Sequence, residues 1–494
     1  MKILSAAQTQ KADAYTIKHE PIAGIDLMER AARQLYNWFH ENIPNTTEII
    51  VCCGKGNNGG DGLALSRMLL FAGWNVKTLI VNHSENSSED FSINLGRLKK
   101  IKSHISEVSA LSDLDEFDQN AILVDAILGS GLSKPLQGLI AEVSNHLNSL
   151  FNFVIAIDIP TGLFAEPTNE NDYANVLQAD LTLTFQAPFL SFMFPESGSL
   201  VGQFEVLDIG LSQEFIEDVE CVYHFVTLPE IEWAFTPKEK FAYKGTNGHA
   251  VIVGGTKGKM GAVALSSKAC LKSGAGLVTA GIPDEGISIL QNTVPEIMAS
   301  DFMNLGVDVK NTYAFGPGLE TSEAAAEKLV DLLKLIEAPV VLDADALNIL
   351  SAKKQWQHVP NKSILTPHIG ELARMVGKQN SGFEYLKAAQ TFADEHGFHI
   401  VVKGPHTAIV SPNAETWFNS TGNQGMGTAG SGDVLTGMIT SFLAQGYDPK
   451  EAAILGVYFH GLAGDIAALE NGFSGLIASD IINHIPSAIK SFEG

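Results

Sequence analysis

The sequence predicts an α/β protein with two successive domains, and three observations support this prediction. Apolar runs of strand-like length alternate with helical patterns, which is typical of a parallel sheet covered by helices on both faces. The alternation stops near Gly210 and starts again at His249–Val253. The length of 494 residues also exceeds the usual size of one domain. We therefore expect a three-layer α/β/α domain over residues 1–213 and a second α/β domain over residues 222–494.

The first domain is expected to open with an amphipathic helical segment, Met1–Trp38, that covers one face of the sheet. Buried strands follow, and the first of them leads into a helix at Leu63–Ala72. The mixed segment Ser212–Lys240, which contains an acidic cluster, would separate the two domains. The predicted strands of the first domain are Glu48–Cys53, Val76–Val81, Ala121–Asp125, Val154–Ile157 and Leu181–Phe185.

The second domain repeats the same rhythm. Helices are expected at Val263–Ser273, at residues 346–351 and at Val434–Gln445, each after a turn that follows a strand or a loop. The predicted strands of this domain are Ala250–Val253, Leu277–Ile282, Tyr313–Phe315, Val340–Asp343, Ser363–Thr366 and His399–Lys403.

The composition argues against several classes of function. A formal net charge of −24 disfavours nucleic acid or an anionic membrane as the main ligand. The four cysteines show neither zinc-site nor C-x-x-C spacing, so buried reduced thiols are expected. No apolar run is expected to span a membrane, and the N-terminus turns polar too soon for a signal peptide. We therefore expect a cytoplasmic protein.

A glycine-rich segment at residues 419–432 leads directly into the helix predicted at Val434–Gln445. Such a turn lets backbone N–H groups converge on an anion at the start of the helix. Asp433 lies beside this anion site, where a carboxylate can take the proton of a substrate hydroxyl next to a nucleotide. The alternative is a tight loop in which Asp433 only caps the helix.

The first domain has three comparable strand ends. Gly54–Gly62 follows a strand and precedes a helix, and Asp125 and Asp158 each end a later strand. Ligands of open α/β sheets bind at the carboxyl ends of the strands, so these three segments should converge on one crevice. Taken singly, each segment also fits a tight turn or a helix cap.

These residues resemble a known family. Gly54–Gly62, Val124–Gly138 and Ala156–Gly162 are similar to the signature of NAD(P)H-hydrate epimerases. The resemblance implies a Rossmann-like domain that binds NADH or NADPH carrying water at ring carbon 6, with Asp158 as the catalytic acid and base and with Asn58, Asp125 and Thr161 as ligands of K⁺. The implied substrate contacts are Asn57, Asn58, Gly59, Gly60, Asp61, Gly129, Ser130, Gly131, Leu132, Ser133, Lys134, Pro135 and Asp158.

Two positions depart from the family pattern. Phe164 stands where the family usually has Asp, and Gln186-Ala-Pro stands where it usually has Pro-Lys. If either missing residue is needed for turnover, epimerisation would be weak or lost in this chain.

The second domain brings further chemical groups to its strand ends. Glycine-rich turns occur at Gly254–Ala262 and Ala314–Gly318, and two carboxylates, Asp343 and Asp345, follow a strand. His368 follows the next strand, and Lys403 ends the one after it. Taken singly, His368 also fits a structural histidine, Asp343 and Asp345 fit caps of the helix at residues 346–351, and Lys403 fits a surface charge.

This second set resembles the ADP- or ATP-dependent NAD(P)H-hydrate dehydratases, which have a ribokinase-like fold. The matching motifs include Leu342-Asp-Ala-Asp-Ala-Leu-Asn348, Thr366-Pro-His-Ile-Gly-Glu371 and Gly432-Asp-Val-Leu-Thr-Gly437. The resemblance implies Asp433 as the catalytic base, Mg²⁺ as the phosphate partner, ADP as the co-substrate that gives AMP and phosphate, and a homo-oligomer. The implied hydrate contacts are Ala262, Gly318, His368 and Asp433, and the implied nucleotide contacts are Lys403, Gly404, Pro405, His406, Thr407 and Gly432.

The main interpretation is therefore a two-domain enzyme that repairs hydrated nicotinamide nucleotides. One alternative is a ribokinase-like kinase for a vitamin precursor, fused to a non-catalytic Rossmann-like domain. A third possibility is a nucleotide-binding scaffold whose first domain has lost its activity, which the departures at Phe164 and Gln186 keep open.

Overall fold

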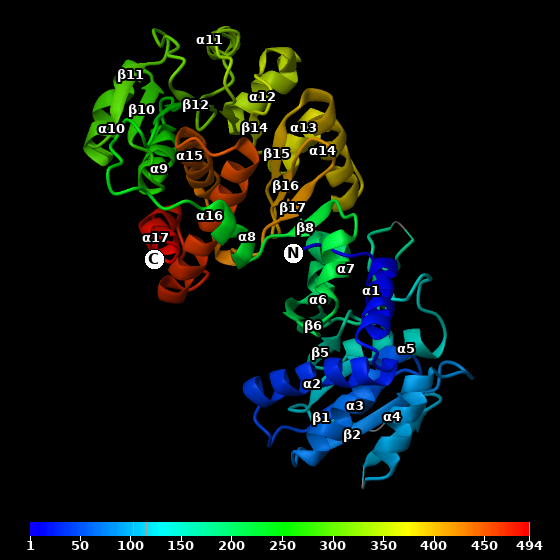
Figure 1. Cartoon of the computed structure of the whole chain (residues 1–494). Helices are drawn as coiled ribbons and strands as arrows, with labels where there is room; N and C mark the ends of the chain where they lie inside the picture. The colour runs from blue at the N-terminus through cyan, green and yellow to red at the C-terminus, as the bar shows by residue number, and fades with distance from the viewer. Residues whose placement is uncertain (102, 115, 169, 494) are drawn as a thin grey trace. The chain divides into compact units, whose positions relative to one another are not determined.

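The computed structural model describes residues 1–101, 103–114, 116–168 and 170–493. The chain forms two compact units: Lys2–Cys221, and Val222–Gly494 together with Met1 (Figure 1). Residues 214–221, which the sequence prediction left between the domains, belong to the first unit. The reason is local packing, because the rings of Tyr15 and Phe215 lie 5.3 Å apart between helices α1 (Ala6–His19) and α7 (Gln213–Asp218).

The first unit contains one parallel sheet of seven strands in the order β3-β2-β1-β4-β5-β6-β7. This confirms the predicted parallel α/β architecture. The two edge strands, β3 and β7, were not among the predicted strands, because exposed polar residues interrupt their apolar pattern. The strands are β1 (Ile49–Cys53), β2 (Val76–Val81), β3 (His104–Val108), β4 (Ile122–Ala126), β5 (Phe153–Ile157), β6 (Leu181–Phe185) and β7 (Gln203–Leu207).

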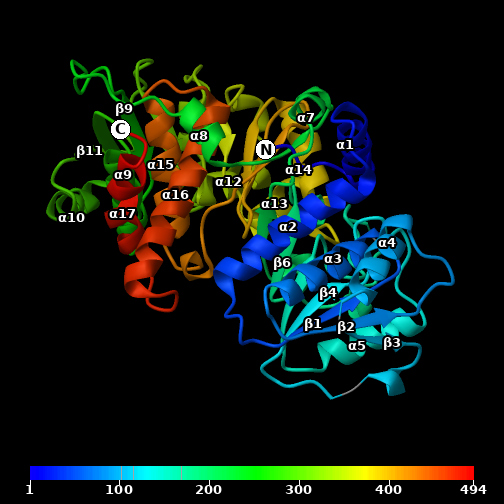
Figure 2. The ribbon, with the colours of Figure 1, turned by 60° about the horizontal axis from the view of Figure 1, so that its bottom comes forward.

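Helices cover both faces of this sheet (Figure 2). Successive side chains of a strand point to opposite faces. Accordingly, Ile49 and Val51 of β1 pack in one core with helices α2, α3 and α4, whereas Ile50 and Cys52 pack in another core with α5. The helices of this unit are α1 (Ala6–His19), α2 (Gly24–Asn42), α3 (Asn57–Phe71), α4 (Glu89–Lys99), α5 (Leu139–Asn148), α6 (Pro195–Val201) and α7 (Gln213–Asp218).

Two helices of the first unit differ from the prediction. The segment Met1–Trp38 is helical, as predicted, but it consists of two helices, α1 and α2, with a break between them. Pro21 explains the break, because its ring disfavours helical backbone at the preceding residue and its nitrogen has no hydrogen to donate. Helix α3 begins at Asn57 and not at Leu63, so the Asn-Asn-Gly-Gly motif forms the first turn of the helix.

The second unit contains a sheet of ten strands in the order β11-β10-β9-β12-β13-β14-β15-β16-β17-β8. All pairs from β11 to β15 are parallel, as predicted, while β16 is antiparallel to both of its neighbours. The strands are β8 (Tyr223–Phe225), β9 (His249–Val253), β10 (Leu277–Ile282), β11 (Met298–Asp301), β12 (Thr312–Phe315), β13 (Val341–Leu342), β14 (Ile364–Leu365), β15 (His399–Val402), β16 (Ala408–Val410) and β17 (Thr416–Phe418).

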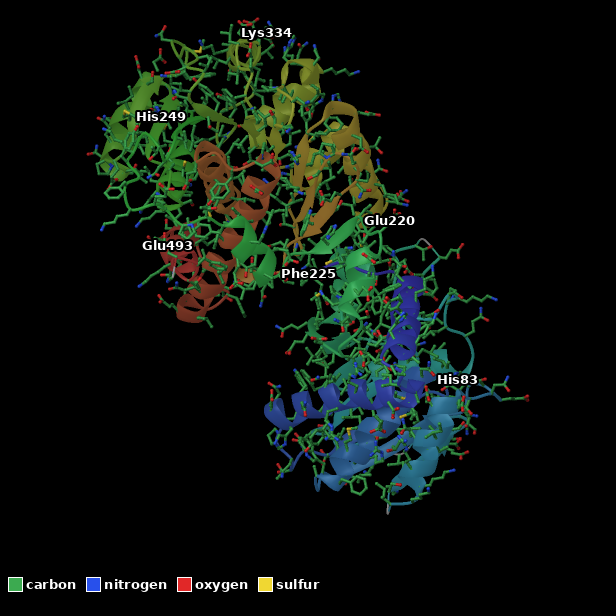
Figure 3. All side chains as sticks on the ribbon, viewed as in Figure 1. His83, Glu220, Phe225, His249, Lys334 and Glu493 are labelled. Carbon is green, nitrogen blue, oxygen red and sulfur yellow. The ribbon has the colours of Figure 1, made fainter. Side chains whose placement is uncertain are left out.

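Most helices of the second unit were not located from the sequence, although the three that were predicted are present with shifted ends. Ala250 and Ile252 of β9 share a core with α9, α15, α16 and α17. His249, at the start of β9 (Figure 3), places its Nε2 atom 2.8 Å from the Thr279 hydroxyl. The helices are α8 (Leu228–Ala234), α9 (Met260–Lys272), α10 (Ile287–Thr293), α11 (Glu323–Leu333), α12 (Ala344–Lys353), α13 (Ile369–Val376), α14 (Gly382–His396), α15 (Ser431–Ala444), α16 (Pro449–Asn471) and α17 (Ala478–Lys490).

Helix α16 corrects one expectation from the sequence. Its 23 residues are long and apolar enough, by length and composition, to cross a membrane, whereas no such segment was expected. However, 72% of its apolar window is buried inside the protein, as in the core helix of a large domain.

Candidate active sites

The glycine-rich turn of the first unit brings α3 against the carboxyl end of β4. A Cβ atom on Gly59 would lie 1.8 Å from the carbonyl oxygen of Gly54, so only glycine allows this turn to close. The turn places Asn58 beside the β4 loop, where its Nδ2 donates a hydrogen bond of 3.0 Å to the carbonyl oxygen of Leu128.

Asp125 and Thr161 are joined by direct hydrogen bonds. The Thr161 backbone N–H and hydroxyl donate to the two Asp125 carboxylate oxygens at 2.7 Å each, and the hydroxyl accepts from the N–H of Leu128 at 2.9 Å. Burial raises the pKa of the Asp125 carboxyl to about 6, although the bonds from Thr161 oppose this shift. The structure therefore places the three predicted K⁺ ligands around the β4 and β5 loops.

The side chain of Asn58 offers a direct test of whether a cation fits here. Its Oδ1 atom is buried and has no hydrogen-bond partner among the described residues. A buried amide oxygen without a partner is costly, and a hard cation prefers ligands of this kind. The oxygen atoms of Asn58, Asp125 and Thr161 therefore suit a cation such as K⁺.

Asp158 lies next to these residues. Its backbone has φ = 68°, a left-handed conformation that is uncommon outside glycine, at the point where β5 ends. The Asp158 carboxylate accepts a hydrogen bond of 3.3 Å from the N–H of Ser130. A Cβ atom on Gly129 would lie 3.3 Å from both the Asp158 Oδ2 atom and the Asn58 Cβ atom, so these three residues adjoin one another.

Several carboxyl groups lie close to Asp158. Burial raises the pKa of Asp158 to about 6, against a smaller opposing effect of the hydrogen bond from Ser130. Burial and the Asp158 charge raise the pKa of Asp13 to about 6, and burial raises the pKa of Asp61 well above its ordinary value. Asp13 was not predicted as a site residue, because it lies on α1, far along the chain from any glycine-rich motif.

The remaining predicted contacts of the first site are less closely gathered. In the segment 131–135, residues 131, 133 and 134 are exposed, and only Gly129 and Ser130 of this loop lie beside Asp158. The two departures from the family pattern have structural contacts of their own. Phe164 is buried, and the Gln186 side-chain oxygen accepts hydrogen bonds of 3.3 Å from the N–H groups of Ile209 and Leu211.

In the second unit, close contact between α9 and α15 positions the site. A Cβ atom on Gly437 would lie 2.1 Å from the carbonyl oxygen of Ser266, so glycine lets the two helices touch. Their N-terminal ends border an open pocket of about 450 Å³. Its lining includes Gly258, Lys259, Gly261, Ala262, Leu265, Gly318, Asp345, Ala429, Gly430 and Asp433.

Asp433 lies in the first turn of α15, as predicted, and reaches this pocket together with Ala262 and Gly318. Burial raises the pKa of Asp433 to about 7, and the Asp343 charge adds to this shift while Lys403 opposes it. A half-buried carboxyl with a pKa near neutrality at the N-terminus of a helix is suited to take a proton from a bound substrate.

Lys403 is held by carboxylates. Its Nζ lies 2.9 Å from Asp343 Oδ1 and 3.9 Å from Glu371 Oε2, and the Thr436 hydroxyl donates to Asp343 Oδ2 at 2.7 Å. Burial disfavours the Lys403 ammonium, but Asp343, Glu371 and Asp433 together raise its pKa. Although Asp343 precedes α12, its side chain does not cap that helix. The cap was the one role that the sequence suggested for Asp343, and no role was predicted for Glu371 or Thr436.

His368 is exposed and caps α13. Its Nδ1 accepts a hydrogen bond of 2.9 Å from the N–H of Gly370, and its Nε2 lies 3.4 Å from Glu371 Oε1. Glu371 thus lies between His368 and Lys403, which are also paired by a backbone bridge. The turn at residues 404–407 closes on itself through the Thr407 hydroxyl, which donates to the Gly404 carbonyl oxygen at 3.0 Å.

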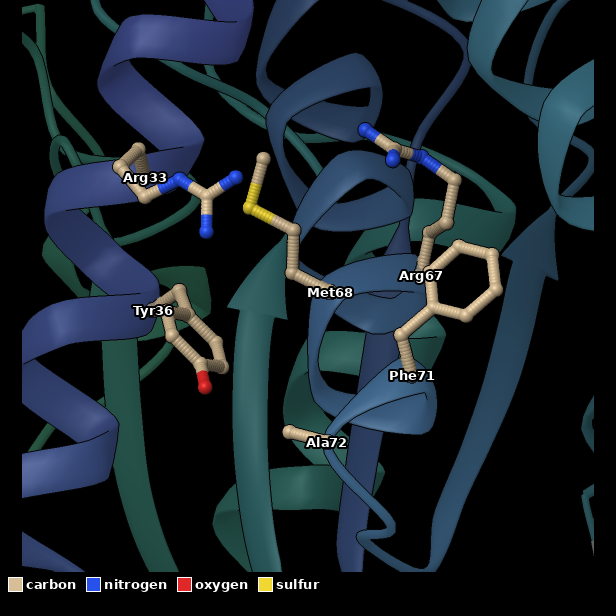
Figure 4. Close-up of a pocket in the computed structure, with 6 residues that line it drawn as sticks. All are labelled: Arg33, Tyr36, Arg67, Met68, Phe71 and Ala72. Atoms are coloured by element: carbon tan, nitrogen blue, oxygen red, sulfur yellow. The ribbon is translucent and has the colours of Figure 1, made fainter.

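A further hollow of about 240 Å³ lies between α2 and α3 (Figure 4). It is near the C-terminal end of α3, whereas Asn57–Asp61 form the first turn of that helix. The hollow contains none of the predicted site residues. Its lining residues are Arg33, Tyr36, Arg67, Met68, Phe71 and Ala72.

Comparison with known proteins agrees with this division. The family model for NAD(P)H-hydrate dehydratase matches residues 250–487, and the model for the YjeF-related protein N-terminus matches residues 24–190. The ADP/ATP-dependent NAD(P)H-hydrate dehydratase of Bacillus subtilis, co-crystallised with ATP and Mg²⁺, superposes with a TM-score of 0.51 at 30% identity, covering 55% of this chain and 99% of that chain. This likeness confirms the ribokinase-like fold of the second domain.

Two curated relatives match nearly the whole chain. The bifunctional NAD(P)H-hydrate repair enzyme Nnr of Moorella thermoacetica is 34% identical, covering 100% of this chain and 97% of the relative. The enzyme of the same name from Escherichia coli is 30% identical, covering 94% of this chain and 89% of the relative. These matches do not support the vitamin-precursor kinase. The chain belongs to the family of bifunctional NAD(P)H-hydrate repair enzymes.

Proposed function

We propose that the second domain dehydrates S-NAD(P)H hydrate with ADP as phosphoryl donor and Asp433 as general base. The observation that carries this proposal is the position of Asp433, which lies in the first turn of α15, lines the open pocket and has a pKa of about 7. Near neutral pH such a carboxylate is ionised in a large fraction of molecules, and it is basic enough to accept a hydroxyl proton.

The reaction then proceeds in two steps. The C6 hydroxyl oxygen attacks the terminal phosphorus of ADP, its proton passes to Asp433, and AMP leaves. The lone pair of the ring nitrogen expels phosphate from C6 and a proton leaves C5, which restores the C5–C6 double bond of the dihydronicotinamide. The N–H groups at the start of α15 stabilise the charge that develops on the transferred group.

The remaining predicted residues hold the two substrates. Ala262, Gly318 and Asp433 line the open pocket, and this supports a hydrate site at the N-terminal ends of α9 and α15. Magnesium, when bound with the nucleotide, neutralises phosphate charge. Within the described part of the chain, no group of three or more His, Cys, Asp or Glu side chains could hold a metal, which suits an ion bound mainly through phosphates. The nucleotide contacts are Lys403, Gly404, Pro405, His406, Thr407 and Gly432.

In the first domain, Asp158 acts as acid and base for epimerisation at C6. It protonates the hydroxyl that leaves C6 as the ring nitrogen donates its lone pair, and in the reverse direction the same carboxylate takes the proton of water that adds to C6. Epimerisation results when the planar ring presents its other face to Asp158 before water adds. Asn58, Asp125 and Thr161 would hold K⁺, which would supply positive charge to the site. The unpartnered Asn58 oxygen supports this assignment.

The test is recovery of reduced-nicotinamide absorbance from a mixture of both hydrate epimers, with Mg²⁺, K⁺ and either ADP or ATP. Full recovery with one nucleotide would support both activities and identify the donor. Recovery that stops after the S epimer is consumed would leave the first domain as a binding scaffold. No recovery with either nucleotide would overturn the proposal.

A further inference from the structure

The carboxylate of Asp343 connects three elements of the second domain. Asp343 directly follows β13. Its carboxylate accepts a hydrogen bond of 2.9 Å from the ammonium of Lys403, which follows β15, and one of 2.7 Å from the hydroxyl of Thr436 on α15. Asp343 is only 2% exposed and Thr436 is fully buried. Each carboxylate oxygen therefore has its own donor, so the orientation of the carboxylate is fixed.

The position of Lys403 depends on this carboxylate. Lysine has a flexible four-carbon chain, and an ammonium without a partner would turn toward solvent or toward another carboxylate. Its other near carboxylate oxygen, Glu371 Oε2, is farther away at 3.9 Å. The Lys403 Nζ also lies 3.5 Å from the place that a Cβ of Gly432 would take, directly beside the first turn of α15. Held there, the ammonium is next to Asp433.

Thr436 makes the connection to the base direct. It lies three residues after Asp433 on α15, and residues at this spacing share one face of a helix. The same helix therefore carries the general base and the hydroxyl that orients Asp343. Any rotation of the Asp343 carboxylate would move the ammonium relative to Asp433 and to the glycine-rich N-terminus.

We propose that Asp343, oriented by Thr436, is a positioning residue that holds the Lys403 ammonium beside Asp433 for phosphoryl transfer. This inference rests on the proposed dehydratase function. It makes Lys403 a fixed internal cation of the second site, with Asp343 acting only through it.

A double-mutant cycle tests the inference with purified full-length protein and S-NAD(P)H hydrate. Asp343→Asn should lower kcat by roughly 100-fold with the KM for hydrate changed little, because small misplacement of a catalytic group costs about this much. In a Lys403→Met background, Asp343→Asn should change kcat by less than about threefold, because its effect passes through Lys403. An equal loss in both backgrounds would overturn the inference.

Loss of one partner could also unfold the domain, since it leaves a buried charge unpaired. Thr436→Val is a smaller change, which should lower kcat roughly 10-fold, and Thr436→Ser should recover most of the lost rate. Thr440→Val is the matched control, because the hydroxyl of this buried threonine, one turn later, donates to the Thr436 carbonyl oxygen and to no other group among the described residues. Full kcat in Thr436→Val would overturn the inference. If wild-type protein restores no absorbance, the proposed function fails instead.

Discussion

The two sites bury carboxylates in different electrostatic surroundings. In the second domain, Asp343, Glu371 and Asp433 surround the Lys403 ammonium, which offsets part of their charge. In the first domain, no lysine, arginine or histidine forms an ion pair with Asp125 or Asp158 among the residues that the structure describes.

This difference indicates the source of the positive charge that compensates the carboxylates of each site. Buried carboxylates are stable only when a cation or several donors compensate them, and otherwise they remain protonated. The second site has a cation of its own. The first site combines raised pKa values with an unpartnered Asn58 oxygen, as expected of a site completed by an ion from solution.

The largest expected effect separates the two activities. Asp433→Asn should lower the dehydration rate by about 10³-fold, because a general base contributes roughly that factor. Epimerisation of the hydrates, followed by chromatography of the two epimers, should keep its wild-type rate. Comparable loss of both activities would show that the sites are not separate.

The sequence alone predicted the α/β class and most of the strands, but few of the helices of the second unit. The buried strands β1, β4, β9 and β12 were found because each is almost wholly apolar and ends at a glycine-rich turn or an aspartate. Edge strands such as β3 and β7 escaped detection, because one exposed face breaks their apolar pattern.

The candidate sites were predictable only where a motif marks them. Asp433 follows the glycine-rich segment at residues 419–432, and Asp158 lies within the motif Ala156–Gly162. In contrast, Thr436 looks like an ordinary helical residue and Asp13 like an ordinary charge on an amphipathic helix, and only folding brings them to the sites. Contacts between segments nearly one hundred residues apart, such as Thr436 with Asp343, leave no local signal in the sequence.

The second largest effect concerns the first site. Asp158→Asn should slow epimerisation by about 10²-fold, because the amide can neither donate nor accept the proton that C6 chemistry needs. Absorbance recovery from a mixed substrate should then stop once the S epimer is consumed, while dehydration of pure S epimer continues normally. Unchanged full recovery would show that another group, such as Asp13, carries the proton.

Removal of K⁺ should sharpen the contrast between the sites. Replacing K⁺ by choline should slow epimerisation by roughly 10-fold. The charge of the second site does not depend on K⁺, so the dehydration rate should stay the same. K⁺ should also raise the melting temperature of the wild-type first domain, because a ligand stabilises the state that binds it. Asn58→Leu should abolish both responses, and a persistent response in this variant would place the ion elsewhere.

The smallest expected effect concerns how strongly each site disfavours the ionised form of its aspartate. The folded state raises the pKa of Asp433 from 3.8 to about 7, so the folded protein holds that proton more tightly than the unfolded chain does. Stability is therefore lost as the pH rises from 3.8 to about 7, and stays lost above that range. Asp433→Asn should raise the melting temperature of the second domain at pH 8 by about 2–4 °C per kcal/mol recovered, with little change at pH 4.

The pKa of Asp158 is raised only to about 6, so the gain in melting temperature from Asp158→Asn should level off about one pH unit lower. Calorimetry of both variants across this range measures the difference. Identical pH dependence would mean that Asp433, beside Lys403, and Asp158 of the first site have the same pKa in the folded protein.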